Sequence, residues 1–216
     1  MLKDLLFDLD DTIVSLNNSR EKVVLDIFKN YLNKDFDILS VRQLIKENKQ
    51  KDYVDTINVI LKKFGCIVDA EKLVNEFSLN YLTIAKDTEE LIVDDSTLNY
   101  LKSKYNLYIV TDRPRLFYDG IWKDKLSIYF NDAICHDDFK DIQRKPSPDI
   151  INKTIERFNL DTEYYVGNDI KDILAAHSAN LKSIFVKHTN KNSEEIEKYK
   201  PEIILDNIND LINVIL

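Results

Sequence analysis

The chain has 216 residues, of which 44% are hydrophobic and 31% are charged, the composition of an ordinary soluble globular protein. Its formal net charge of −8 argues against nucleic-acid binding driven by phosphate neutralisation. No signal sequence is visible, and no apolar segment approaches the ~20 residues of a membrane span. Cys66 and Cys135 lie far apart and fit no metal-ligand spacing, so we expect free thiols and a cytoplasmic protein.

Glycine is scarce in this sequence, which contains only Gly65, Gly120 and Gly167. Neither the phosphate-binding P-loop nor the glycine-rich loop of dinucleotide-binding proteins can be built from three glycines at these positions. If the protein handles phosphate, other groups must hold it.

Near the start of the chain, a short apolar run from Leu5 to Phe7 leads straight into three aspartates and a threonine, Asp8-Leu9-Asp10-Asp11-Thr12. This pattern predicts a buried strand that delivers carboxylates to its carboxyl end. Crowded carboxylates repel one another unless a cation sits among them. The alternative is an ordinary Asp-rich turn after a strand.

Residues 15–95 show the spacing of consecutive amphipathic helices and no convincing strand. We expect helices over residues 18–32, 41–47, 53–64 and 70–85. Asn18 and Glu21 resemble a capping box at the start of the first helix. Gly65 is placed to end the third helix, and Asp69 to cap the fourth.

From Ser96 onward, apolar strands alternate with helical patterns, which is typical of a parallel sheet covered by helices on both faces. The expected strands include residues 107–110, 133–135, 183–186 and 203–205, and a last helix is expected over residues 208–216. We therefore predict an α/β fold with a doubly wound, Rossmann-like parallel sheet. Its core takes residues 1–14 and 96–216, and a helical domain of residues 15–95 is inserted.

Polar residues stand at the carboxyl ends of three of these strands, where ligands bind in such sheets. Asp8 and Asp10 follow the first strand, Thr111 and Asp112 follow residues 107–110, and Asn168 and Asp169 follow Tyr164-Tyr165-Val166-Gly167. The topology therefore predicts one polar rim built from three separate strands.

Four motifs in this order resemble those of the haloacid-dehalogenase-like (HAD) hydrolases, and the resemblance covers essentially the whole chain. They are Asp8-Leu9-Asp10-Asp11-Thr12, Thr111, Lys145 in Lys-Pro-Ser-Pro, and Gly167-Asn168-Asp169-Ile170-Lys171-Asp172. The resemblance is to members with a helical cap inserted after the first motif, the phosphoglycolate phosphatase-like and beta-phosphoglucomutase-like group. It implies that residues 15–95 form this cap.

The resemblance and the chemistry of the side chains suggest the same roles. Asp8 would attack phosphorus and form an aspartyl-phosphate, while Asp10 would protonate the leaving oxygen and later deprotonate water. Thr111, Asp112 and Lys145 would bind the phosphate. Mg²⁺ fits a set of oxygen donors from Asp8, the main-chain carbonyl of Asp10 and the fourth motif. The dehalogenases of the superfamily lack the second aspartate, so Asp10 favours phosphoryl transfer.

The fourth motif departs from its relatives, which usually read Gly-Asp-Ser-x-x-Asp-Ile where this chain reads Gly-Asn-Asp-Ile-Lys-Asp-Ile. Asn168 takes the place of the usual metal aspartate, and Asp172 keeps the downstream acid, which is also a candidate metal ligand. An asparagine carbonyl can ligate Mg²⁺ with less negative charge. Alternatively, Asp169 serves as the ligand after a shift of one residue.

Other conspicuous side chains have simpler interpretations. Arg113 and Arg115 follow a strand end and are expected at the surface, with contact to substrate as the alternative. Arg144 is expected in solvent, and Trp122 in packing. The three histidines fit no metal-binding spacing: His136, His177 and His188.

The sequence thus predicts a Mg²⁺-dependent phosphatase acting on a small phosphorylated metabolite, with phosphoglycolate, sugar phosphates and nucleotides all open. One alternative is a phosphoryl-transfer mutase of the same superfamily. Another is a catalytically weak relative that binds a phosphometabolite or a protein, which the altered fourth motif would suit. We expect no nucleic-acid or membrane partner, and the oligomeric state stays open.

Overall fold

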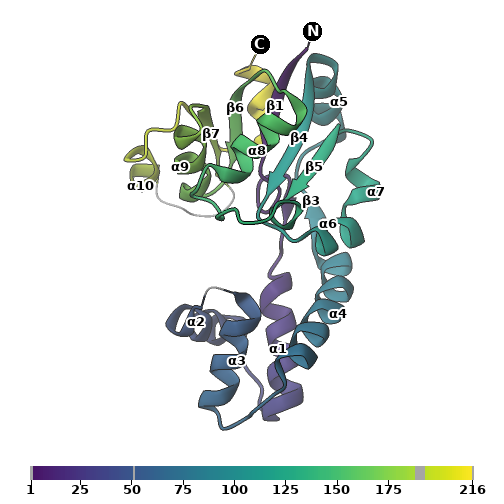
Figure 1. The fold of residues 1–216 in the computed structure, drawn as a ribbon, viewed down its shortest axis with the longest axis vertical. Helices are drawn as coiled ribbons and strands as arrows, with labels where there is room; N and C mark the ends of the chain where they lie inside the picture. Colours follow the sequence, from purple (N-terminus) through teal and green to yellow (C-terminus); the bar gives the residue numbers. More distant parts are fainter. Residues whose placement is uncertain (1, 51, 188–192, 216) are drawn as a thin grey trace. The chain divides into compact units, whose positions relative to one another are not determined.

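The computed structural model describes residues 2–50, 52–187 and 193–215, and the chain divides into two compact units. The first unit, which we call the core unit, comprises Met1–Ser15 and Glu90–Leu216, and the second, the helical unit, comprises Leu16–Glu89. Figure 1 shows the sheet with its helices in one unit and helices alone in the other. The role of the helical unit as a cap stays a prediction.

The core unit is built on a six-stranded sheet in the order β5-β4-β1-β6-β7-β8, and every neighbouring pair is parallel. The predicted α/β fold with a parallel sheet is confirmed. The strands are β1 (Lys3–Phe7), β4 (Tyr105–Thr111), β5 (Asp132–Cys135), β6 (Thr162–Gly167), β7 (Lys182–Val186) and β8 (Ile203–Leu205).

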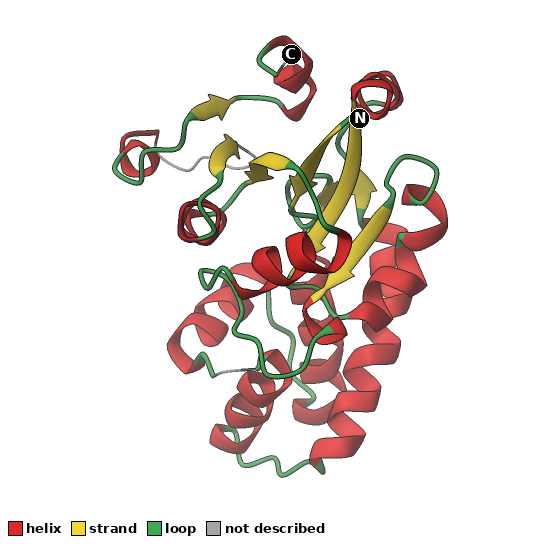
Figure 2. Ribbon diagram, turned by 45° about the horizontal axis from the view of Figure 1, so that its top comes forward, coloured by secondary structure: helices red, strands yellow, loops and turns green. Residues whose placement is uncertain are grey.

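Helices flank this sheet (Figure 2), because its strands are apolar on both faces and need cover. One buried cluster joins Leu6 of β1 and Val110 of β4 to Ile150 and Ala175 on two of the helices. The helices of the core unit are α5 (Asp95–Lys104), α6 (Arg115–Ile121), α7 (Lys123–Leu126), α8 (Asp149–Phe158), α9 (Ile170–Ser178) and α10 (Ser193–Glu197).

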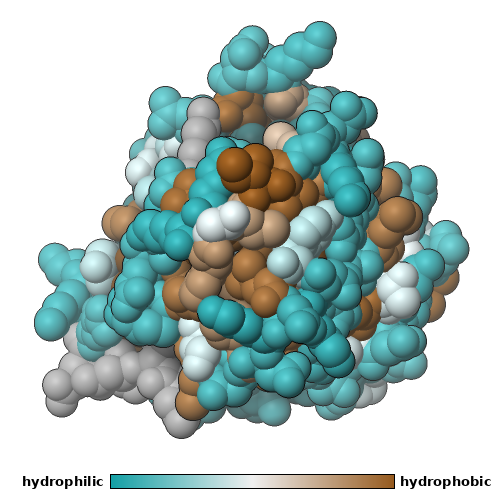
Figure 3. Space-filling view, turned by 90° about the horizontal axis from the view of Figure 1, so that it is seen from below, coloured by the Kyte–Doolittle hydropathy of each residue, from teal (hydrophilic) through white to brown (hydrophobic). Residues whose placement is uncertain are grey.

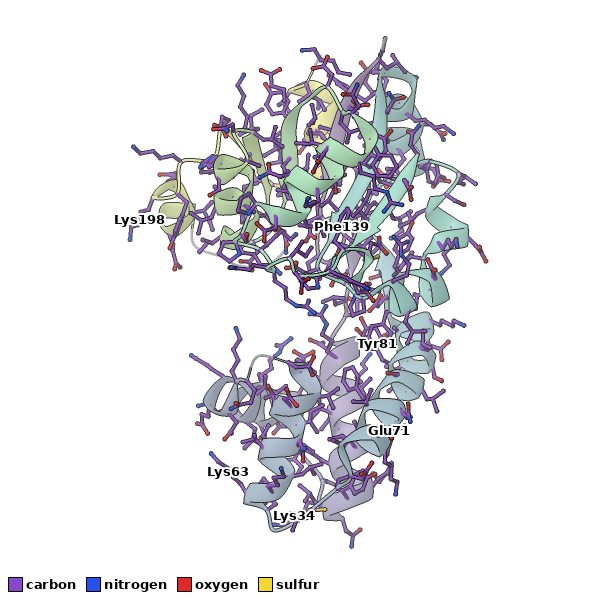
Figure 4. All side chains as sticks on the ribbon, in the orientation of Figure 1. Lys34, Lys63, Glu71, Tyr81, Phe139 and Lys198 are labelled. Carbon is purple, nitrogen blue, oxygen red and sulfur yellow. The ribbon has the colours of Figure 1, made fainter. Side chains whose placement is uncertain are left out.

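The helical unit contains the four helices that the periodicity predicts. They are α1 (Ser19–Leu32), α2 (Ile38–Asn48), α3 (Tyr53–Lys63) and α4 (Ala70–Thr88). Within their core, the buried Glu89 carboxylate accepts hydrogen bonds from Ser19 Oγ at 2.9 Å and from the hydroxyl of Tyr81, labelled in Figure 4, at 2.7 Å. Most of the surface seen in Figure 3 is hydrophilic, with apolar side chains gathered on part of it.

Two predicted helix starts have different outcomes. Asp69 caps α4 as expected, since its carboxylate accepts from Lys72 N at 2.9 Å. The prediction of a capping box at Asn18 is wrong, because Asn18 adopts a left-handed conformation with φ 62° and its side chain makes no capping hydrogen bond. Its side-chain oxygen accepts from Arg42 instead.

Two further expectations on secondary structure need correction. Val14–Ser15 (β2) and Glu90–Leu91 (β3) form a small antiparallel ladder, although no strand was expected within residues 15–95. The predicted helix at the carboxyl end is a 3₁₀ helix over Ile208–Asn213, and Leu216 lies outside the described residues.

The remaining expectations concern single residues. Both cysteines are free, and Trp122 is buried as predicted. His177 Nε2 contacts Ser183 Oγ at 3.1 Å and lies 3.4 Å from Glu202 Oε2, whereas His188 lies outside the described residues. Among the helices that the structure describes, none is both long and apolar enough to cross a membrane.

Gly167 gives a direct test of packing at the end of β6. A Cβ atom at this position would lie 2.5 Å from Asp172 Cβ, well inside van der Waals contact. We expect Gly167→Ala to destabilise the protein by about 1–3 kcal/mol through overpacking. Thermal unfolding measures the loss.

Gly120→Ala is the matched control, because Gly120 is exposed within α6 and alanine there should stabilise by about 0.5–1 kcal/mol. Equal melting temperatures for the two variants would contradict the packing argument.

Candidate active site

The first strand ends by placing the Asp8 carboxylate inside the core unit. Asp8 N donates to Val166 O of the adjacent β6 at 2.8 Å, so the sheet ladder continues one residue beyond β1. The chain then turns tightly, with Leu9 O accepting from Ile13 N at 2.9 Å and Asp11 held at φ 57°. Asp8 is only 4% exposed, so its charge must be balanced by neighbouring groups.

The neighbouring cation is Lys145, whose ammonium group is completely enclosed. Its Nζ donates to Asp8 Oδ1 at 2.7 Å, to Asp172 Oδ1 at 2.6 Å and to the Tyr165 hydroxyl at 2.9 Å. An ammonium group has three protons, and each is satisfied. Lys145 is therefore not a solvated loop lysine, and the four residues form what we call the lysine cluster: Asp8, Lys145, Tyr165 and Asp172.

Tyr165 was missed by sequence reasoning, which treated it only as part of a strand. It is fully buried on β6, and its hydroxyl donates to Val110 O at 2.7 Å. The Tyr165 hydroxyl thus donates its proton to a carbonyl of β4, and its oxygen accepts a hydrogen bond from Lys145. Nothing in the sequence separates this tyrosine from the preceding Tyr164, because strand registers decide which of the two faces inward.

The fourth motif is ordered by Asp172 from within α9. Asp172 Oδ2 accepts from the backbone N–H groups of Asn168, at 3.2 Å, and Asp169, at 2.9 Å. In return the Asp169 carboxylate caps the helix by accepting from Lys171 N at 3.2 Å. Both oxygens of Asp172 are therefore engaged by protein groups.

Thr111 and Asp112 lie at the end of β4, the strand next to β1. Thr111 is buried, and its Oγ1 accepts from Arg113 N at 3.1 Å, which leaves the hydroxyl proton available for donation. Asp112 is approached by Lys171 Nζ, 3.3 Å from Oδ2, and its carbonyl accepts from Arg144 Nη1 at 2.7 Å.

Arg113 corrects an expectation, because it is not a surface residue. It is 2% exposed, and its guanidinium contacts Asp10 Oδ1 through Nε at 2.8 Å and Nη2 at 2.7 Å. Its position directly after a strand of the polar rim was a usable signal in the sequence. Arg144 is exposed as predicted, whereas Arg115 is partly buried beside Asp138.

The lysine cluster contains two carboxyl groups and one ammonium group, so it carries one excess negative charge when both carboxyl groups are ionised. Burial raises the pKa of Asp8 to about 7, and Asp172 adds to this while Lys145 opposes it. Burial also acts to lower the pKa of Lys145, but the Asp172 and Asp8 carboxylates overcome that effect and hold it well above its ordinary value. Lys145 therefore stays charged.

A divalent cation suits this excess charge. Within the described residues, no three or more His, Cys, Asp and Glu side chains are grouped so that they could hold a metal by themselves. The predicted donor set differs from such a group, because it combines the Asp8 carboxylate with a main-chain carbonyl and an amide or carboxylate of the fourth motif. Such oxygen donors, completed by water, are those that Mg²⁺ accepts, so the residues fit the ion.

Comparison with known proteins establishes the class. The model of the family described as "Haloacid dehalogenase-like hydrolase" matches residues 5–186, so the chain belongs to this family of hydrolases. The predictions of the superfamily and of an enzyme are thereby confirmed. All eight predicted site residues lie within the matched range.

The individual relatives share low sequence identity with this chain. "Pyrophosphatase PpaX" of Bacillus mycoides is 26% identical over 223 residues, covering 99% of this chain and 97% of the relative. A Thermotoga maritima structure named as a beta-phosphoglucomutase aligns with a TM-score of 0.79 at 17% identity, covering 99% and 98% of the two chains. The structure of the HAD-hydrolase YfnB of Bacillus subtilis, bound to magnesium, aligns with a TM-score of 0.75 at 19% identity, covering 99% of this chain and 98% of that one. The two structures share the fold.

The pKa of Asp8 predicts a pH dependence of stability without added metal. Because the pKa of Asp8 is about 7 in the folded protein against an ordinary 3.8, the folded state binds this proton more tightly. The resulting stabilisation is complete below pH ~4 and is lost as the pH rises through about 7. In chelator, we expect the melting temperature of the wild type to fall relative to that of Asp8→Asn between pH ~5 and pH ~8.

Asp11→Asn is the control, since asparagine also tolerates the left-handed conformation of this turn. It should follow the wild type across the pH range. If the melting temperatures of the wild type and Asp8→Asn change with pH in the same way, the assignment of the proton to Asp8 is contradicted.

Proposed function

We propose that this hydrolase is a Mg²⁺-dependent phosphatase that acts on a small phosphomonoester through a phospho-aspartyl intermediate. The observation that carries the proposal is the lysine cluster, in which a buried carboxylate is held at 2.7 Å from a buried ammonium. A carboxylate attacks a phosphate anion only where fixed positive charge offsets their repulsion. Lys145 supplies that charge next to Asp8.

In the first step, an Asp8 oxygen attacks phosphorus while the bond to the leaving oxygen breaks. Asp10 donates its proton to that oxygen. Thr111 offers its hydroxyl proton, and Asp112 its backbone N–H, to the non-bridging oxygens. In the second step, Asp10 takes a proton from water as the water attacks the phospho-aspartate, which releases phosphate and restores Asp8.

Mg²⁺ would neutralise phosphate charge and lower the repulsion felt by the incoming carboxylate. Asp8, the main-chain carbonyl of Asp10 and the fourth motif would hold it. Within that motif, both oxygens of Asp172 accept hydrogen bonds from protein groups, so we assign Asp172 to the support of Lys145 and the loop. Asn168 and Asp169 are the side chains that we propose for the metal.

The helical unit is proposed to act as the cap that selects the substrate, as its insertion after the first motif supports. A cytoplasmic location is proposed as well, and the two free cysteines support it.

Turnover of p-nitrophenyl phosphate with and without Mg²⁺ tests this function. Asp8→Asn should lower kcat by about 10³-fold or more, because the nucleophile is lost. Asp11→Asn should retain activity, since no chemical role is assigned to it. Mg²⁺-independent turnover, or turnover that survives Asp8→Asn, would defeat the proposal.

Pyrophosphate is a second candidate substrate, favoured by two cations around Asp112. Lys171 Nζ lies 3.3 Å from its carboxylate, and Arg144 donates to its carbonyl at 2.7 Å. They add positive charge to the rim, which an anionic leaving group would use. The name of the Bacillus relatives points the same way.

Substitution of these cations separates the two substrate classes. Lys171→Gln and Arg144→Gln should raise the KM for pyrophosphate about 10-fold and that for phenyl phosphate by less than about 3-fold. Lys153→Gln is the control, because Lys153 is an exposed lysine paired with Glu156 on α8. Equal effects on both substrates would exclude a role in binding a second phosphate.

A further inference from the structure

We infer that Arg113 is a positioning residue, which holds the Asp10 carboxylate in place for proton transfer to the leaving group. The inference rests on the proposed phosphatase function. It gives a role in that reaction to a residue outside the four motifs.

The geometry of the pair is specific. Arg113 Nε donates a hydrogen bond to Asp10 Oδ1 at 2.8 Å, and Nη2 lies 2.7 Å from the same oxygen as an ion-pair contact. The Arg113 side chain is 1% exposed, and that of Asp10 is 17% exposed. An ion pair enclosed to this degree is screened little by solvent, so it constrains the carboxylate far more than a surface pair would.

The two partners come from different loops. Asp10 follows β1 and Arg113 follows β4, its neighbour in the sheet. The backbone N–H of Arg113 also donates to Thr111 Oγ1 at 3.1 Å. One residue thus orients both the proposed acid and the proposed phosphate-binding hydroxyl.

This arrangement matters because Asp10 lies beyond the end of β1, where it forms an isolated β-bridge with Val14 next to a turn. General acid catalysis requires the carboxyl group to lie within hydrogen-bond reach of the leaving oxygen. As the phosphorus–oxygen bond breaks, its electron pair passes to the leaving oxygen and the proton of the Asp10 carboxyl group moves there, while an Asp8 oxygen bonds to phosphorus.

A leaving-group series tests the inference. We expect Arg113→Met to lower kcat/KM for phenyl phosphate about 10²-fold, but that for 2,4-dinitrophenyl phosphate less than about 3-fold, because the better leaving group needs little protonation. The ratio kcat/KM reports formation of the phospho-enzyme and not its hydrolysis. Arg113→Lys keeps the positive charge but lacks the guanidinium group. Its kcat/KM for phenyl phosphate should therefore lie between the values of Arg113→Met and the wild type.

Arg115→Met is the matched control. Arg115 is a nearby arginine that pairs with Asp138, not with Asp10. Its loss should affect both substrates equally. In an Asp10→Asn background, Arg113→Met should cause no further loss on phenyl phosphate, because its effect acts through Asp10.

Each outcome decides the matter. No turnover by wild type defeats the proposed function, and the inference falls with it. Turnover by wild type with equal losses on both substrates, for Arg113→Met or for Arg113→Lys if the first fails to fold, overturns the inference alone. An additional loss in the Asp10→Asn background does the same.

Discussion

The site depends on one ammonium group, that of Lys145, buried between two carboxylates and a phenol. Each of its three protons meets an oxygen from a different place in the chain: Asp8 after β1, Tyr165 within β6 and Asp172 within α9. A charge cannot be buried without such partners, so these contacts fix the three elements relative to one another. The same contacts keep the proposed nucleophile beside a permanent positive charge.

The constraint spreads outward from there. Asp172 can reach Lys145 only because Gly167 leaves room for it, and its second oxygen orders the backbone of Asn168 and Asp169. Tyr165 extends the network to β4 through Val110 O. The structure thereby links the altered fourth motif to the nucleophile by hydrogen bonds, so Asn168 sits in a loop that the rest of the cluster already positions.

A second, partly buried ion pair, between Arg113 and Asp10, ties the loop after β1 to the loop after β4. Asp8 of the lysine cluster and Asp10 of this pair both follow β1, so the two sets of contacts meet at the carboxyl end of that strand. At the carboxyl ends of its strands, a parallel sheet leaves backbone groups unpaired, and side chains from several strands converge there. Figure 1 shows β1 and β4 side by side at this part of the core unit.

By itself the sequence predicted the α/β fold and the helical insertion from local periodicity, and the polar rim from the order of polar residues at strand ends. Lys145 was identified through the resemblance of its Lys-Pro-Ser-Pro motif to the family. The sequence did not distinguish Tyr165 from Tyr164, and it placed Arg113 at the surface and a cap at Asn18. Those outcomes depend on strand register, on the burial of a long side chain and on a left-handed turn. Only the tertiary structure decided them, since each is set by contacts between residues far apart in the chain or by the turn that the packing imposes.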